Sequence, residues 1–92
     1  MQYIVEKVFA KAANSLPKDV QINISDFIKA IETAHHLTAI NNIKKLKTNR
    51  KDQRECYRYK TGNYRVGFVL EEGDIVRLVV AEHRKNIYKN FP

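Results

Sequence analysis

The apolar residues recur at helical spacing in the first third of the chain and at alternate positions in much of the second half. An opening strand is predicted over residues 2–7, followed by a helix over residues 8–16. Pro17 ends this helix and opens a second one that reaches about residue 35. The pattern therefore predicts a helical hairpin that covers one face of a sheet. The second helix carries the longer apolar stripe, made of Val20, Ile24, Phe27, Ile28 and Ile31.

The connection over residues 37–54 changes character halfway along. Ile40, Ile43 and Leu46 lie three residues apart, which predicts a short turn of helix packed on the core. A polar stretch over residues 47–54 follows. Two interpretations of it stay open, namely a loop that clamps a phosphate backbone and a solvated surface loop.

Three strands are predicted in the second half, over residues 55–61, 64–71 and 75–82. Gly62-Asn63 marks a two-residue turn, and a three-residue loop with Gly73 in the left-handed conformation joins the last two strands. A short helical element ends the chain. The elements predict one α+β domain over residues 1–92: an N-terminal strand, the helical hairpin, then an antiparallel three-strand meander. The side chains expected to pack under the helices are Tyr57, Tyr59, Val66, Phe68 and Leu70.

The hairpin turn also predicts a cluster of positive charge. With Gly62-Asn63 as the loop, Lys60 lies opposite Arg65 and Arg58 lies opposite Gly67. Because side chains alternate between the faces of a sheet, the three cations share one exposed face. Like charges opposed across strands are destabilising, so an anion bound between them is one explanation. A solvated face with splayed cations is the other. Gly67 is expected to leave room for an anion to approach the backbone.

The distribution of charge along the chain favours an anionic partner. The net charge is +7, with a sequence pI of about 9.7. Residues 1–43 carry four basic and four acidic residues, so the whole excess lies in residues 44–92, with thirteen basic and six acidic. Nine of those thirteen fall between Lys44 and Arg65. This asymmetry indicates a nucleic-acid surface or an acidic protein partner, and a basic surface kept for solubility is the alternative.

Several other classes of protein are excluded by absent features. No apolar run reaches the roughly 18 residues of a membrane span, and the first residues lack the apolar run of a signal peptide. A single cysteine, Cys56, excludes an internal disulfide and fits a reducing cytoplasm. No Cys/His spacing indicates a metal site, and there is no Gly-rich phosphate loop. A cytoplasmic protein without metal or cofactor is therefore expected.

Two segments, in this order along the chain, resemble segments of one known family. Residues 56–68, Cys-Tyr-Arg-Tyr-Lys-Thr-Gly-Asn-Tyr-Arg-Val-Gly-Phe, resemble the central hairpin of RelE-family toxins. Residues 81–88, Ala-Glu-His-Arg-Lys-Asn-Ile-Tyr, are similar to the C-terminal element of that family. The opening strand, the helical hairpin with Leu16-Pro17 and the segment Ile43-Lys44-Lys45-Leu46 also fit. The resemblance spans nearly the whole chain and points to the RelE/ParE superfamily of type II toxins, with a RelE-like, microbial-RNase-type fold.

What the resemblance implies is a ribosome-dependent mRNA endoribonuclease. RelE-like members cleave mRNA in the ribosomal A site without a metal, by transferring a phosphodiester to the neighbouring ribose 2′-OH. The family pattern uses a basic strand pair, an arginine on the next strand, and an arginine and a tyrosine near the C-terminus. The residues that match it here are Arg58, Lys60, Arg65, Arg84 and Tyr88.

The chemistry of these residue types supports such a reaction. Attack by a 2′-OH requires a base, neutralisation of charge on the phosphorane-like state, and an acid for the 5′ oxygen. Lys60 is the candidate base, because Arg58 and Arg65 beside it should lower its pKa. The two arginines suit the phosphate oxygens. Arg84 would stabilise charge and protonate the leaving oxygen, with His83 as a second candidate acid or a residue bonded to the backbone. Tyr88 would stack on a base or orient the 2′-OH.

Two further readings and a set of partners complete the sequence-based expectations. The same fold includes ParE-like inhibitors of DNA gyrase, and a catalytically silent relative that only binds an antitoxin is the third possibility. The first two readings imply a cognate acidic antitoxin in a hetero-oligomer. Three contact modes stay open for it: covering the cationic face, displacing the C-terminal element, or placing a helix on the core face beside the predicted helices. The basic residues expected to contact RNA or the ribosome are Lys44, Lys45, Lys47, Arg50, Lys51, Arg54 and Lys85.

Overall fold

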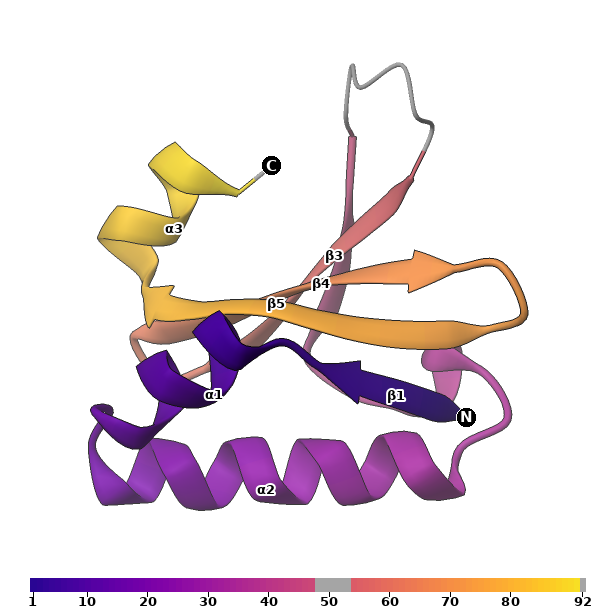
Figure 1. Cartoon of the computed structure of the whole chain (residues 1–92), viewed down its shortest axis with the longest axis horizontal. Helices are drawn as coiled ribbons and strands as arrows, with labels where there is room; N and C mark the ends of the chain where they lie inside the picture. Colours follow the sequence, from indigo (N-terminus) through magenta and orange to yellow (C-terminus); the bar gives the residue numbers. More distant parts are fainter. Residues whose placement is uncertain (48–53, 92) are drawn as a thin grey trace.

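The computed structural model describes residues 1–47 and 54–91, which form one mixed sheet with helices on both faces (Figure 1). The chain begins with β1 (Gln2–Val5), α1 (Lys7–Asn14) and α2 (Lys18–Thr33). A 3₁₀ turn, η1 (Leu37–Ala39), leads to β2 (Ile43–Leu46). The remaining elements are β3 (Glu55–Thr61), β4 (Tyr64–Glu71), β5 (Ile75–His83) and α3 (Arg84–Asn90). The expected order of strand, helical hairpin, meander and C-terminal helix is therefore confirmed.

The predicted register of the meander is also confirmed. The five strands lie in the order β1-β5-β4-β3-β2, with β1 parallel to β5 and all other neighbours antiparallel. Lys60 is paired with Arg65, and Arg58 with Gly67. A bulge between Gly67 and Phe68 then shifts β5 by one residue, so that Phe68 faces Leu78. Alternation along these strands places the cations on one face and the aromatic residues on the other.

Two hydrophobic clusters lie on opposite faces of the sheet. The larger one packs α1 and α2 on the meander, and Phe27 stacks on Tyr59 with ring centroids 4.0 Å apart. Its buried members are Phe9, Val20, Ile24, Phe27, Ile31, Val66, Phe68, Val76, Leu78 and Ala81. The smaller cluster holds α3 against the other face through Ile87 and Phe91, which pack on Cys56 and Val69. In Figure 1, α2 and α3 accordingly lie on opposite sides of the strands.

The expected helical turn over Ile40, Ile43 and Leu46 is wrong. The 3₁₀ turn η1 comes earlier, and Ile43–Leu46 is an edge strand paired with β3. Residues three apart lie on opposite faces of a strand, so Ile43 joins the larger cluster and Leu46 the smaller one. The three-residue spacing of Ile43 and Leu46 therefore comes from a strand whose two faces are both covered, and not from a helical turn.

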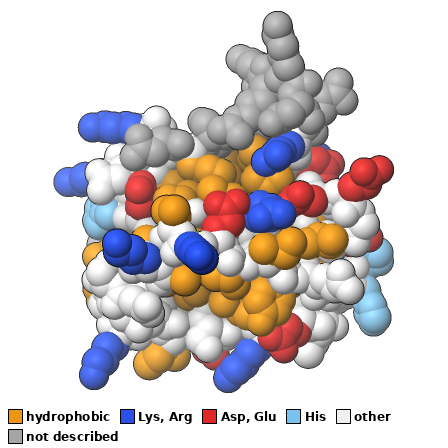
Figure 2. Space-filling model, in the orientation of Figure 1, with side chains coloured by type: hydrophobic (Ala, Val, Ile, Leu, Met, Phe, Trp, Pro, Cys, Tyr) orange, Lys and Arg blue, Asp and Glu red, His pale blue; other side chains and the backbone are white. Residues whose placement is uncertain are grey.

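The view in Figure 2 shows acidic and basic side chains interspersed with hydrophobic ones around β1, β5 and α2. An ion pair joins Arg77 of β5 to Glu71, and Glu6 lies 3.7 Å from the same guanidinium.

Over the described ranges 1–47 and 54–91, no helix is long and apolar enough to cross a membrane. The same residues contain no group of three His, Cys, Asp or Glu side chains that could hold a metal ion.

Candidate active site

Basic residues form two cross-strand pairs on the sheet face that carries α3. Lys60 of β3 faces Arg65 of β4, and two residues earlier on β3 Arg58 faces Lys44 of β2. Both pairs oppose like charges, which is destabilising in the absence of an anion. The structure therefore brings together the cations that the hairpin pattern predicted and adds Lys44 to them.

These side chains surround a hollow of about 310 Å³. Its exposed wall includes Lys60, while Arg58 is half-buried. Arg65 is only 8% exposed, and its Nη1 donates to the carbonyl oxygens of Gly62 at 2.8 Å and Tyr64 at 2.9 Å. The expectation that Arg65 stands on an exposed face is thus wrong, because the hairpin turn folds back to hold the guanidinium. The lining residues are Asn42, Ile43, Lys44, Arg58, Lys60, Arg65 and Tyr88.

Tyr88 stands over this hollow on α3. Its ring lies 4.5 Å from the Arg58 guanidinium carbon and 6.0 Å from that of Arg65, and the residue is 54% exposed. Burial acts to raise the pKa of Tyr88, but contact with Arg65 and the charges of Arg65, Arg58 and Arg84 outweigh it. The pKa therefore lies below its ordinary value, which makes the phenol a better hydrogen-bond donor and proton donor than a solvated tyrosine.

Titration of Tyr88 should show this environment directly. We expect its phenolate to form at lower pH than the phenolates of Tyr3, Tyr57 and Tyr59, whose pKa values are raised. A phenol with a lowered pKa stabilises the fold above its unfolded pKa, and that contribution is lost as pH falls through the folded pKa. The difference in phenolate absorbance between the wild type and Tyr88→Phe isolates this group. A Tyr88 titration above that of the other tyrosines would contradict the placement.

Gly67 has a different role from the one that the sequence predicted. A Cβ built on Gly67 would lie 2.7 Å from Cδ2 of Phe91 and 2.7 Å from Cγ1 of Val80. The Phe91 ring fills the space above the glycine, so this space is not open to an anion. Phe91 is 7% exposed, and with Ile87 it anchors α3 on the sheet. Gly67 therefore acts on Tyr88 indirectly, by letting α3 sit close to β4.

The variant Gly67→Ala should displace Phe91 and loosen α3. Overpacking of this kind destabilises a fold by about 1–3 kcal/mol. Because two of the three short contacts are with the Phe91 ring and the third is with Val80, Gly67→Ala should cost less in a Phe91→Ala background than in the wild type. Urea unfolding of the four proteins gives this coupling. Additive losses would show that Gly67 and Phe91 do not act on each other.

Arg84 and His83 lie at the start of α3 and have different surroundings. The Arg84 backbone N–H donates to the Asn63 carbonyl oxygen at 2.8 Å, which ties α3 to the hairpin turn, and its charge contributes to lowering the pKa of Tyr88. His83 Nδ1 accepts from the Lys85 backbone N–H at 3.2 Å, and its ring meets Tyr64 edge-on at 5.4 Å. His83 therefore caps α3, as the interpretation of a backbone-bonded residue expects.

The other predicted RNA contacts are spread more widely. Lys44, Lys45 and Lys47 line a second hollow of about 460 Å³, although the Lys45 ammonium pairs with Glu55 at 3.1 Å. Arg54 is exposed just before β3, and Lys85 is exposed on α3 and lines neither hollow. Arg50 and Lys51 lie outside the described residues. So does most of the polar stretch over residues 47–54, for which a phosphate clamp and a solvated loop were the two interpretations.

Two residues of the site were missed by sequence reasoning. Asn42 lines the hollow with a φ of 67°, and its carbonyl oxygen accepts the Lys60 N–H at 2.9 Å. Asparagine tolerates this left-handed conformation better than most residues, so Asn41-Asn42 was an available turn signal. Phe91 was missed because its partner, Gly67, is distant in sequence and carries no side chain to suggest a contact.

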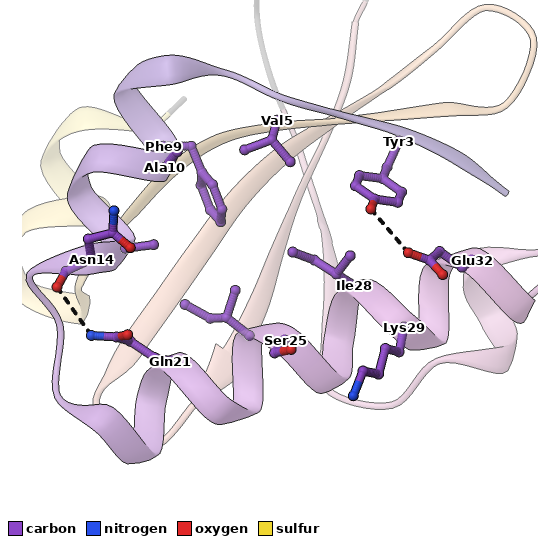
Figure 3. Close-up of a pocket in the computed structure, with 12 residues that line it drawn as sticks. Tyr3, Val5, Phe9, Ala10, Asn14, Gln21, Ser25, Ile28, Lys29 and Glu32 are labelled. Atoms are coloured by element: carbon purple, nitrogen blue, oxygen red, sulfur yellow. Dashed lines mark hydrogen bonds between the residues drawn. The ribbon is translucent and has the colours of Figure 1, made fainter.

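A separate groove of about 440 Å³ lies on the helical side (Figure 3). It opens between β1, α1 and α2, and Figure 3 shows Tyr3 reaching Glu32 and Gln21 reaching the Asn14 carbonyl across its ends. Lys29 is the one basic residue among those that line it, beside a largely apolar wall. The groove therefore lacks the converging cations that phosphate chemistry requires.

Comparison with known proteins agrees with the fold. No protein-family model matches the sequence. The chain is 30% identical to "Toxin RelE3" of Methanocaldococcus jannaschii over 93 residues, which covers both proteins completely. The toxin–antitoxin complex RelB-RelE from Methanococcus jannaschii contains a chain with a TM-score of 0.78 and 29% identity, covering 97% of this chain and 99% of that one. The RelE-RelB complex of Pyrococcus horikoshii shares the fold at a TM-score of 0.71 and 22% identity, over 90% and 93% of the two chains. The chain belongs to the RelE family of toxins.

Proposed function

We propose that the protein is a ribosome-dependent mRNA endoribonuclease and the toxin of a type II toxin–antitoxin pair. The observation that carries the nuclease proposal is the hollow in which Lys60, Arg65 and Arg58 converge beneath the ring of Tyr88. A phosphodiester in this hollow would have cations on its oxygens and a phenol of lowered pKa at its edge. Family membership supports the same conclusion.

The reaction we propose is transfer of the phosphodiester to the neighbouring 2′-OH. Lys60, the exposed amine of the hollow, takes the proton from the 2′-OH as its oxygen bonds to phosphorus. Arg65 is held by two carbonyl oxygens, so its remaining N–H groups are preoriented to stabilise the phosphorane-like state. The bond to the 5′ oxygen then breaks, leaving a 2′,3′-cyclic phosphate and a 5′-OH.

The proton for the leaving 5′ oxygen has two candidate sources on α3. Arg84 was the residue favoured from the sequence, but a guanidinium has a very high pKa and is a poor acid. Tyr88 contacts the Arg58 guanidinium and has a lowered pKa, so we add it as a proton donor beside its proposed stacking role. Arg84 lines neither hollow, and we propose that it acts through its charge, which helps to lower the pKa of Tyr88.

The partner we propose is an acidic antitoxin of the RelB type. The solved relatives from Methanococcus jannaschii and Pyrococcus horikoshii are complexes of RelE with RelB. A segment rich in Asp and Glu would neutralise the like-charged pairs at the hollow and relieve their repulsion across the strands. Binding there would block the RNA site by direct competition.

Primer extension on an mRNA in a reconstituted translation reaction tests the proposal. We expect cuts that require ribosomes and that fall sharply for Arg84→Ala, with Lys29→Ala on α2 as a control of equal charge change. Intact mRNA with the wild-type protein would contradict the nuclease proposal. A gyrase supercoiling assay on the same preparation would then separate a ParE-like inhibitor from a silent toxin.

A further inference from the structure

The cationic face contains two like-charged pairs, and the proposed cleavage reaction accounts for one of them. Lys60 and Arg65 surround the site of the reacting phosphate, and Arg58 lies at its edge. Two residues earlier than Lys60 on β3, Arg58 is also opposed by Lys44 of β2. A cross-strand pair of like charges is destabilising by itself. The second pair therefore needs an explanation of its own, and an anion distinct from the reacting phosphate would supply it.

The second pair opens into its own hollow. This hollow, of about 460 Å³, shares Lys44, Arg58 and Tyr88 with the first and is also lined by Lys47. No carboxylate lines either hollow within the described part of the chain. The two hollows are thus neighbours that share cationic walls, and the Tyr88 ring and the Arg58 guanidinium, 4.5 Å apart, line both.

The spacing of the two pairs matches a nucleic-acid backbone. Arg58 and Lys60 are two residues apart on β3, so the pairs are separated by about 6.6 Å along the strand. Successive phosphates of an extended single strand are separated by a distance of the same order. The aromatic ring between the pairs is placed where the nucleoside joining two phosphates would lie, and aromatic rings stack on bases of any sequence.

We infer that the hollow lined by Lys44, Lys47 and Arg58 is a second phosphate subsite, which holds the phosphodiester next to the one that reacts. This inference rests on the proposed function, since the first hollow is taken to hold the reacting phosphate. The ligand it predicts is a single-stranded RNA segment with at least two consecutive phosphodiesters. Both phosphates are bound through charge and fork geometry, so the subsite fixes the position of the strand and does not read its sequence.

Binding of short RNA ligands that cannot react tests this inference without cleavage. The probes are 2′-O-methyl uridine dinucleotide and trinucleotide, with one and two phosphodiesters, titrated into the intact protein by NMR. In the wild type we expect the trinucleotide to bind about tenfold more tightly, which corresponds to about 1.4 kcal/mol. The salt dependence of the trinucleotide should be steeper by about 0.7 in the log–log slope, as for one more neutralised phosphate.

Two variants separate the subsites. Lys44→Ala/Lys47→Ala should remove most of the tenfold gain of the trinucleotide over the dinucleotide, together with the extra salt slope. Lys60→Ala should weaken both ligands and leave the gain intact. The matched control is Lys18→Ala/Lys29→Ala, which removes the same charge from α2 on the opposite side of the sheet and should change neither ligand.

Two results would overturn the inference. The first is an unchanged gain in Lys44→Ala/Lys47→Ala. The second is an equal loss of the gain in Lys18→Ala/Lys29→Ala, which would assign the gain to the overall charge of the protein and not to this hollow. The outcome is distinguishable from failure of the proposed function. If the wild type cleaves RNA but Lys44→Ala/Lys47→Ala keeps the tighter binding of the trinucleotide, only the second subsite is refuted. If that variant loses the tighter binding but the wild type does not cleave RNA, the subsite stands and the nuclease proposal is refuted.

Discussion

Replacing Phe68 by alanine should lower the free energy of unfolding by about 3–5 kcal/mol. Phe68 is fully buried on β4, where its ring stacks with Tyr57 at 5.3 Å and meets Phe27 at 5.6 Å. Truncation removes buried apolar surface and leaves a cavity between the meander and α2, which the surrounding side chains can only partly refill. Urea denaturation of the wild type and the variant measures the loss.

The matched control for this prediction is Ile22→Ala. Ile22 lies on α2 and is 60% exposed, so its truncation should change the unfolding free energy by a small fraction of the Phe68 loss. Similar losses at the two positions would mean that the sheet faces are inverted. Because Phe68 and Arg65 point to opposite faces, such a result would also displace the cations from the proposed site.

Replacing Arg65 by lysine should reduce RNA cleavage by about 10²–10³-fold, the usual effect of losing one preoriented donor at a reacting centre. Lysine keeps the charge, but it cannot hold the Gly62 and Tyr64 carbonyl oxygens and present a fork to the phosphate at the same time. Those carbonyl oxygens would lose a partner, so we also expect a loss of stability of about 1–3 kcal/mol. Single-turnover cleavage rates and urea unfolding measure the two effects.

Arg77→Lys is the control for this variant. Arg77 lies on the same sheet in an ion pair with Glu71, outside the hollow, so the same substitution there should leave the cleavage rate within about twofold. If the Arg65→Lys protein is as stable as the Arg77→Lys protein and cleaves RNA as fast, Arg65 does not take part in the reaction.

The features that could be predicted from the sequence are those fixed by local chemistry. Gly62-Asn63 determines a two-residue turn, and alternation then decides that Lys60 faces Arg65 and that Phe68 points to the helices. Pro17 and the apolar stripe of α2 determine the helical hairpin in the same way. These signals also bring together Arg58, Lys60 and Arg65, because register alone places them on one face.

The features that were missed depend on contacts distant in sequence. Leu46 reads as part of a helical turn until α3 is known to cover the second face of the sheet. Gly67 reads as an opening for an anion until Phe91 is seen to occupy the space. The burial of Arg65 follows from carbonyl oxygens that turn back towards its side chain, which periodicity does not encode.

The most direct test of the proposed reaction is cleavage of an mRNA that carries one 2′-deoxynucleotide immediately 5′ to the cut bond. Attack by the 2′-OH has no nucleophile in this substrate, so cleavage at that bond in the presence of ribosomes should disappear. The unmodified mRNA should be cut and should leave a 2′,3′-cyclic phosphate. Equal cleavage of the two substrates would contradict the account, because the nucleophile would then have to come from elsewhere.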